Sequence, residues 1–156
     1  MLRFLIIEDD SFKCEDLAII VLATFPDANI SYASDVATGV KKIESGQYNL
    51  VIIDMALPSH PVVSGGGSPM SLLNGGLEII FELNSLGRSD DCVIVTQYPE
   101  IKIAGRSIPI KDVVQEIKEK FDCDIVACIE YSDQKIDWKY KFINLLNRYE
   151  NINTRR

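Results

Sequence analysis

Five short apolar runs alternate along this chain with five stretches whose apolar residues recur at helical spacing, and this alternation restricts the fold more than any other feature. The runs are residues 2–7, 30–33, 50–53, 92–95 and 125–129. Short apolar runs are typical of strands that a parallel sheet buries on both faces. Strands that alternate with helices predict βαβ units. We therefore expect an α/β fold, (βα)5, with a doubly wound five-stranded parallel sheet.

The expected helices carry signals at their ends. They are residues 12–24, 36–44, 77–86, 110–121 and 134–149. Ser11, Asp35 and Asp133 precede three of them, and their side-chain oxygens can accept hydrogen bonds from the free N–H groups of a first turn. Pro26 and Gly46 follow the first two, at positions where helices commonly end. These signals support the same alternation.

Two connections are longer than the rest of the pattern requires. Residues 58–76 form an enlarged loop, in which we interpret the glycine run at 65–67 as a flexible tether and expect one turn of helix at 70–73. His60 lies in this loop and is expected to be a surface residue. Residues 97–109 are expected to be irregular. Loops of the first length are usually functional or disordered.

Composition narrows the organisation and the environment of the chain. Its 156 residues and 17.5 kDa match one hydrophobic core, so we expect a single domain over 1–150 and a polar tail at 151–156. A net charge of −7 argues against a nucleic-acid partner. The apolar runs fall short of the roughly 20 residues of a membrane span, which argues against a membrane protein. Four cysteines without CxxC spacing predict free thiols in a reducing cytoplasm.

Acidic residues stand where several of the expected strands end. Glu8, Asp9 and Asp10 follow the first strand, Asp54 follows the third, and Thr96 follows the fourth. Ligand sites of parallel sheets lie at the carboxyl ends of the strands, so these side chains should meet in one crevice. Converging carboxylates repel one another unless a cation lies among them, and hard oxygen ligands suit Mg²⁺. The pattern predicts a divalent cation beside a phosphate-like group, to which Thr96 could donate a hydrogen bond.

Three segments in register resemble the receiver domain of bacterial two-component response regulators. They read FLIIEDD at 4–10, VIIDMALP at 51–58 and VIVT at 93–96. Their order, the spacing from the first acids to the central aspartate and the (βα)5 rhythm all match that family, and the likeness extends to about Tyr149. The resemblance implies a flavodoxin-like receiver fold.

The resemblance also implies roles for individual residues. Asp54 would be the phosphoacceptor, which takes a phosphoryl group from a histidine kinase. Asp9 would bind Mg²⁺ directly, Glu8 through water, and Ala56 through its backbone carbonyl. Thr96 would contact the phosphoryl oxygens and shift when they arrive. In physical terms the metal neutralises charge while the domain positions the reacting groups.

Three departures from the family pattern set this chain apart. The family places a lysine at the end of strand five, usually followed by proline, whereas residues 127–132 read ACIEYS and put Glu130 at that place. Lys135, expected on the first turn of the last helix, is a candidate substitute. Second, the aromatic residue that usually precedes the lysine is missing, since Ala127 stands near its place. Third, the loop after Asp54 and the stretch before strand five are longer than usual.

The leading functional hypothesis is a stand-alone receiver without an output domain, because few residues follow the last expected helix. It would signal through a surface that binds a histidine kinase or a downstream effector, and its oligomeric state stays open, a homodimer included. The alternative is a phosphorylation-independent pseudo-receiver that acts as a protein-interaction module. A Mg²⁺-dependent hydrolase is disfavoured, because Ala56 stands where aspartyl phosphatases typically carry a general-acid aspartate. We therefore expect no enzyme.

Overall fold

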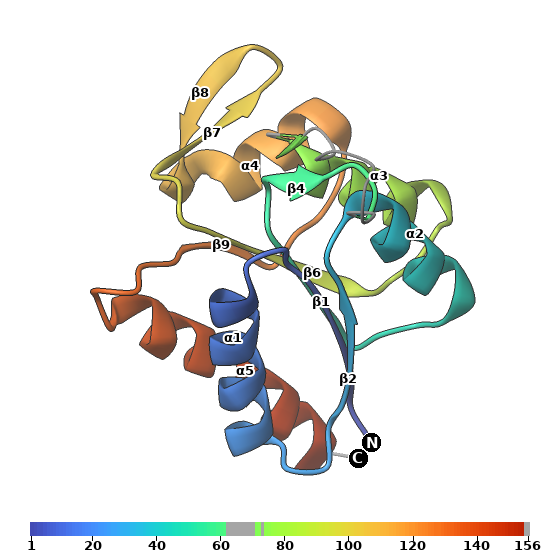
Figure 1. The fold of residues 1–156 in the computed structure, drawn as a ribbon, viewed down its shortest axis with the longest axis vertical. Coiled ribbons are helices and arrows are strands. Elements are labelled where there is room, and N and C mark those ends of the chain that lie inside the picture. Colours follow the sequence, from blue (N-terminus) through green and yellow to red (C-terminus); the bar gives the residue numbers. More distant parts are fainter. Residues whose placement is uncertain (62–70, 73, 155–156) are drawn as a thin grey trace.

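The structure, a computed structural model, describes residues 1–61, 71–72 and 74–154, and its centre is a parallel sheet (Figure 1). The strands of this sheet are β1 (Arg3–Ile7), β2 (Asn29–Ala33), β3 (Leu50–Ile53), β6 (Asp91–Thr96) and β9 (Ala127–Glu130). They lie in the order β2-β1-β3-β6-β9, and every neighbouring pair is parallel. The expected doubly wound (βα)5 fold is confirmed.

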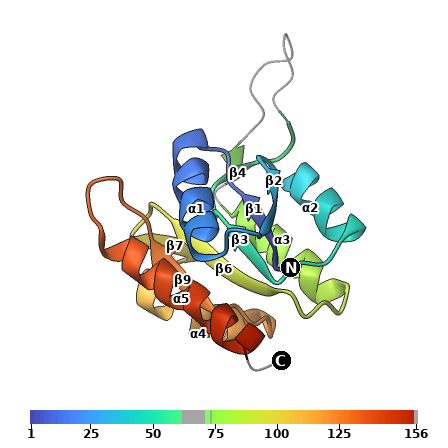
Figure 2. The ribbon, with the colours of Figure 1, turned by 90° about the horizontal axis from the view of Figure 1, so that it is seen from below.

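Helices cover both faces of the sheet (Figures 1 and 2). They are α1 (Ser11–Thr24), α2 (Val36–Ser45), α3 (Gly75–Ser85), α4 (Ile110–Phe121) and α5 (Asp137–Thr154). Helices α1 and α5 pack side by side on one face, and α2, α3 and α4 lie on the other. Because alternate residues of β1 and β3 enter the two apolar cores, both strands are buried on both faces. None of the described helices is long and apolar enough to cross a membrane.

A β-hairpin occupies the segment that was expected to be irregular, so that expectation was wrong. Strands β7 (Glu100–Ile103) and β8 (Arg106–Pro109) pair antiparallel. Ala104 and Gly105 join them with positive φ angles of 51° and 78°, the backbone that tight hairpin turns require. The hairpin projects beside α4 (Figure 1).

The loop after β3 also differs from its prediction. Leu57–Pro58 (β4) pairs antiparallel with Ser71–Leu72 (β5), so the helical turn expected at 70–73 is wrong for 71–72. Residues 70 and 73, and the glycine run at 65–67, lie outside the described residues. The pairing places Pro58, the first residue of the enlarged loop, opposite Ser71.

Two helix starts differ from the sequence interpretation. Asp10, rather than Ser11, caps α1, because its carboxylate accepts hydrogen bonds from the N–H groups of Phe12 and Lys13 at 2.9 and 3.2 Å. Helix α5 begins at Asp137 rather than at 134, so Asp133 is not its N-cap. By contrast, Asp35 caps α2 as expected, through a 2.7 Å bond from the N–H of Thr38.

Candidate functional site

Three carboxylates meet at the carboxyl ends of β1 and β3. Ile7 pairs with Ile53, so Glu8 and Asp54 leave neighbouring strands side by side. One carboxylate oxygen from each of Glu8, Asp9 and Asp54 lies within 4.8 Å of the others. Glu8 and Asp54 are buried, with 5% and 2% of their surface exposed, while Asp9 is exposed. The structure therefore brings together the acidic residues that the sequence predicted to converge.

A lysine that the sequence interpretation missed lies among these carboxylates. The Nζ atom of Lys13 is 2.7 Å from Oε2 of Glu8 and 3.3 Å from Oδ1 of Asp54, and the side chain is 1% exposed. Lys13 is on the first turn of α1, and helical side chains point back toward the N-terminus of their helix. The Asp10 cap fixes that N-terminus at the end of β1, so the side chain of Lys13 reaches the acidic crevice.

The ammonium of Lys13 contacts the end of β6 as well as the carboxylates. It donates to the carbonyl of Val95 at 2.6 Å and to Oε1 of Gln97 at 3.4 Å. Its contacts with the acids are ion pairs, and at 2.7 Å from Oε2 of Glu8 the ammonium is within hydrogen-bonding distance. When both acids are ionised, one ammonium leaves the pair with an excess negative charge, so their oxygens still attract a cation. Such oxygens, beside an exposed third carboxylate, fit a hard cation such as Mg²⁺.

The charge state of the two buried acids reflects the same arrangement. Burial raises the pKa of Glu8 to about 8, although the charge of Lys13 acts in the opposite direction. Burial likewise raises the pKa of Asp54, again against the effect of Lys13. A bound divalent cation would favour both ionised forms, because it adds positive charge next to them.

Thr96 and Ala56 complete the set of predicted residues. Thr96 is the last residue of β6 and is fully buried, and its hydroxyl oxygen accepts a 3.3 Å hydrogen bond from the N–H of Tyr98. Its carbonyl accepts a 2.7 Å bond from the N–H of Tyr131, just after β9. Ala56 is buried two residues after Asp54. These residues thus lie on the strand ends and the turn around the acidic crevice.

The place of the missing family lysine is confirmed to hold an acid. Glu130 ends β9, pairs in register with Thr96 and is exposed. Lys135, the candidate substitute, is exposed, precedes α5 and makes no hydrogen bond or ion pair with the described residues. A signal for Lys13 was present in the sequence, since it lies on the same helix face as Leu17 and Val21, both of which are buried. Its position on the apolar face indicates that Lys13 is buried, but not which groups it contacts.

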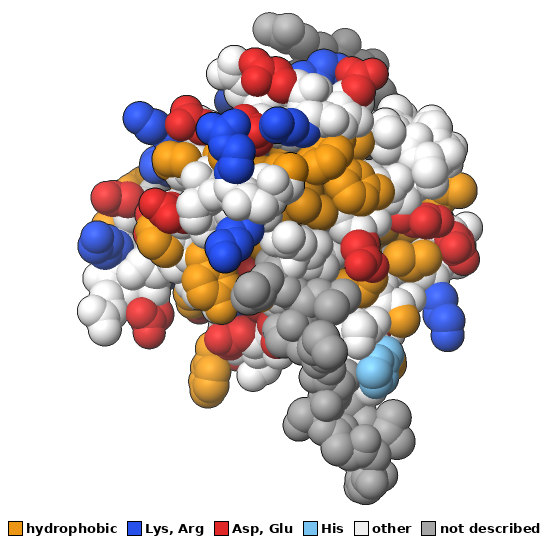
Figure 3. All heavy atoms as spheres, turned by 90° about the horizontal axis from the view of Figure 1, so that it is seen from above, with side chains coloured by type: hydrophobic (Ala, Val, Ile, Leu, Met, Phe, Trp, Pro, Cys, Tyr) orange, Lys and Arg blue, Asp and Glu red, His pale blue; other side chains and the backbone are white. Residues whose placement is uncertain are grey.

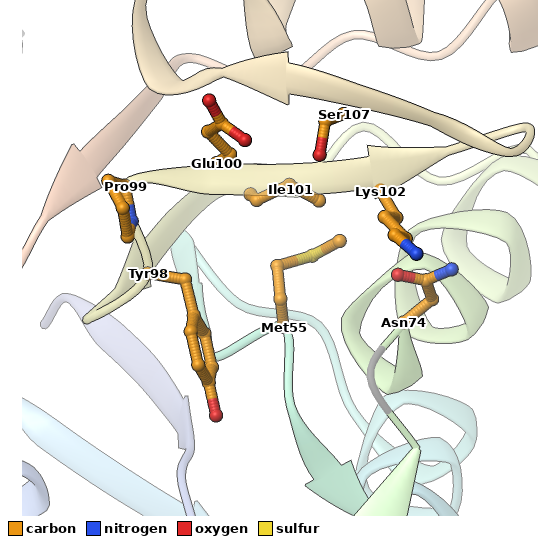
Figure 4. Close-up of a pocket in the computed structure, with 8 residues that line it drawn as sticks. All are labelled: Met55, Asn74, Tyr98, Pro99, Glu100, Ile101, Lys102 and Ser107. Atoms are coloured by element: carbon orange, nitrogen blue, oxygen red, sulfur yellow. The ribbon is translucent and has the colours of Figure 1, made fainter.

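A cavity of about 300 Å³ lies beside the crevice (Figure 4). Met55, next to Asp54, and Asn74 border it on one side, and residues 98–102 and Ser107 border it on the other. Hydrophobic side chains reach the surface between charged ones at this end of the molecule (Figure 3). His60 is exposed, as expected, and its Nδ1 lies 2.8 Å from the hydroxyl of Ser59.

Comparison with known proteins identifies relatives along most of the chain, although no family model matches it. The chain is 32% identical over 146 residues to the Detocs response regulatory protein DtcB of Vibrio alginolyticus. The match covers 91% of this chain and 97% of that protein. It is 24% identical over 139 residues to the uncharacterized protein y4jR of Sinorhizobium fredii, covering 88% and 92% of the two chains.

Solved structures show the same fold. A CheY-like receiver domain protein of Methanospirillum hungatei superposes with a TM-score of 0.60 at 20% identity, over 97% of this chain and 98% of that chain. The response regulator TrrA of Thermotoga maritima, solved in complex with Mg²⁺ and BeF, superposes with a TM-score of 0.57 at 19% identity, over 94% and 99%. The relative in Vibrio alginolyticus and the shared fold together show that this chain belongs to the response-regulator receiver-domain family.

Proposed function

We propose that this chain is a stand-alone receiver that accepts a phosphoryl group on Asp54 from a histidine kinase, in a Mg²⁺-dependent reaction. The observation that carries the proposal is the convergence of two buried carboxylates, those of Glu8 and Asp54, on one ammonium, that of Lys13. Together with the exposed Asp9, they form a site in which a cation would relieve the repulsion between like charges.

The proposed reaction is an in-line displacement at phosphorus. A carboxylate oxygen of Asp54 attacks the phosphorus of a phosphohistidine, and the P–N bond breaks with its electron pair remaining on the imidazole. The imidazole then takes up a proton from solvent, and Asp54 carries an acyl phosphate. Mg²⁺, when bound by Asp54, Asp9, the carbonyl of Ala56 and, through water, Glu8, would neutralise charge on the transferred group.

The phosphorylated domain would signal through its surface. The hydroxyl of Thr96 now accepts a hydrogen bond from the N–H of Tyr98. After phosphorylation it would turn toward a phosphoryl oxygen. The carbonyl of Thr96 accepts a hydrogen bond from the N–H of Tyr131, just after β9. A movement of Thr96 can therefore reach the β6–β9 edge of the sheet and the start of α5. A histidine kinase or a downstream effector would bind there. We also propose that residues 1–150 form a single domain and that the protein is located in the cytoplasm. It would act as a switch rather than as an enzyme.

The test is intact-mass spectrometry after incubation with Mg²⁺ and acetyl phosphate. A gain of one phosphate is expected for the natural chain, and none for Asp54→Asn. Asp27→Asn is the matched control, because Asp27 is an exposed acid in the turn between α1 and β2. A chain that gains no phosphate, and whose melting temperature does not rise with Mg²⁺ and beryllofluoride, would refute the proposal and leave the pseudo-receiver.

A further inference from the structure

We propose that Lys13 supplies the phosphoryl-binding ammonium of this receiver from the first turn of α1. The inference rests on the proposed function, since it gives Lys13 a role toward the phosphoryl group on Asp54. The end of β9 carries an exposed acid, Glu130. The inference therefore places the positive charge of the site on a helix instead of on this strand.

Distance and burial carry the first step. Nζ of Lys13 lies 3.3 Å from Oδ1 of Asp54, so a phosphoryl group attached to that carboxylate would project its oxygens within reach of the ammonium. Among the ion pairs of the described residues, Lys13 is the basic side chain that contacts Glu8 or Asp54. Because Lys13 is only 1% exposed, water screens its charge little. It therefore attracts an anion far more strongly than a surface lysine does.

Charge balance carries the second step. Without a metal, Lys13 is the counter-ion of Glu8 and Asp54. A divalent cation that takes up the same carboxylates would release the ammonium from this role and leave two cations close together. A phosphoryl group on Asp54 then restores negative charge at the place that the ammonium already faces. No covalent bond to Lys13 has to form or break, since the ammonium only exchanges one anionic hydrogen-bond partner for another.

The surroundings of Lys13 connect it to two neighbouring elements. Its hydrogen bond to the carbonyl of Val95 holds it to the end of β6, one residue before Thr96. On the other side, Nζ lies 5.6 Å from the ring centroid of Tyr131, and this ring lies 4.7 Å from the ring of Trp138 in α5. Tyr131 is held in place by the hydrogen bond that its hydroxyl donates to Asp16 at 2.9 Å. A shift of the ammonium toward a phosphoryl group therefore changes the environment of a packed aromatic pair.

Trp138 makes that change measurable, because it is the single tryptophan of the chain and is buried. The experiment titrates the full chain with beryllofluoride at saturating Mg²⁺, follows the fluorescence of Trp138 and the melting temperature, and repeats both measurements on Lys13→Met. Methionine keeps the length and the apolar stem of the side chain and removes the charge. Lys120→Met is the matched control, since Lys120 is exposed on α4, on the opposite face of the sheet from Trp138.

We expect Lys13→Met to bind beryllofluoride on the order of tenfold to a hundredfold more weakly, as the loss of one charged hydrogen bond implies. Mg²⁺ alone should bind Lys13→Met as tightly as the natural chain or more tightly, because a competing cation is gone. This split between the two ligands separates phosphoryl binding from a general loss of structure. If Lys13→Met does not fold, Lys13→Gln, which can still donate to the Val95 carbonyl, takes its place.

Two results would overturn the inference in different ways. Unchanged beryllofluoride affinity in Lys13→Met, with a natural chain that responds, would make Lys13 a structural counter-ion and leave the proposed function intact. A natural chain that neither binds beryllofluoride nor accepts phosphate would refute the proposed function and this inference with it.

Discussion

The carbonyl oxygen of Asp54 lies 2.6 Å from the position that a Cβ atom would take on Gly76, so helix α3 begins in direct contact with the backbone of the proposed phosphoacceptor. The N–H of Gly76 also donates a 3.0 Å hydrogen bond to the carbonyl of Met55. Any side chain at position 76 would have to push the Asp54 turn or the start of α3 aside. The shape of the crevice thus depends on a glycine outside it.

Gly76→Ala is therefore expected to lower the free energy of unfolding by about 1–3 kcal/mol, the usual cost of forcing extra volume into a packed site. It should also weaken the response of the melting temperature to Mg²⁺, because the carboxylate of Asp54 moves with its carbonyl. Urea denaturation with and without Mg²⁺ measures both effects. Gly46→Ala is the control, since its Cβ would meet only the flexible end of Arg3. Equal stability losses in the two variants would contradict the prediction.

Mg²⁺ is expected to stabilise the folded chain, and the carboxylates of the crevice should be needed for this. A ligand present at 100 times its dissociation constant stabilises by about 2.7 kcal/mol when it binds only the folded state. Asp9→Asn and Asp54→Asn should lose most of the gain, because each removes a charged ligand. Thermal melts in Mg²⁺ and in EDTA provide the measurement, with Asp27→Asn as control. A gain that persists in both crevice variants would place the metal elsewhere.

Thr96→Val should separate phosphoryl binding from metal binding. Valine keeps the branched shape and removes the hydroxyl, which now accepts a hydrogen bond from the N–H of Tyr98. We expect a stability loss of about 1 kcal/mol and beryllofluoride binding about tenfold weaker, while Mg²⁺ affinity stays the same. Thr24→Val, which removes a hydroxyl bonded to the carbonyl of Ile20 at the far end of α1, should change neither affinity. Unaltered beryllofluoride binding in Thr96→Val would remove Thr96 from the site.

The strands and the acidic crevice could be predicted from the sequence because both depend on local order. An apolar run such as Leu50–Ile53 defines its own strand, and the parallel topology then brings Glu8 and Asp54 to one edge. The hairpin of β7 and β8 was missed although Ile101 and Ile103 alternate with polar residues before an Ala–Gly turn. The alternation of apolar and polar residues was present in the sequence, but it spans only a few residues.

The contacts of Lys13 and the start of α5 were not predicted, for two different reasons. Lys13 is buried only once α1 packs on the sheet, where the ammonium donates a hydrogen bond to the carbonyl of Val95. At the start of α5, the N–H of Gln134 bonds the hydroxyl of Ser132, a local turn that competes with a helix start at 134. The helical periodicity of the sequence does not show whether this helix begins at 134 or at 137.

An ion pair between Asp90 and Arg88 should make the stability of the folded chain sensitive to acid. The carboxylate of Asp90 accepts two 2.8 Å hydrogen bonds from the guanidinium of Arg88 and a 2.7 Å bond from the N–H of Tyr48. Arg88 in turn donates to the carbonyl of Ile43 at 2.6 Å, so the pair ties the end of α2 to the segments before β3 and β6. Burial alone would raise the pKa of Asp90, but these hydrogen bonds outweigh it and hold the pKa below its ordinary value of 3.8.

The sign of the pH effect follows from that depressed pKa. The unfolded chain takes up the proton more readily, so the stability that Asp90 contributes is complete above pH 3.8 and is lost as the pH falls through the lower, folded-state pKa. Asp90→Asn should therefore be less stable than the natural chain by about 1.5–3 kcal/mol at pH 7, with a difference that shrinks below pH 3.8. Urea denaturation at a series of pH values measures the difference. Asp122→Asn, which breaks an exposed pair with Lys118, should change stability little at any pH. If the curves of Asp90→Asn and the natural chain stay parallel down to pH 3, the Asp90–Arg88 pair is not a source of the acid sensitivity.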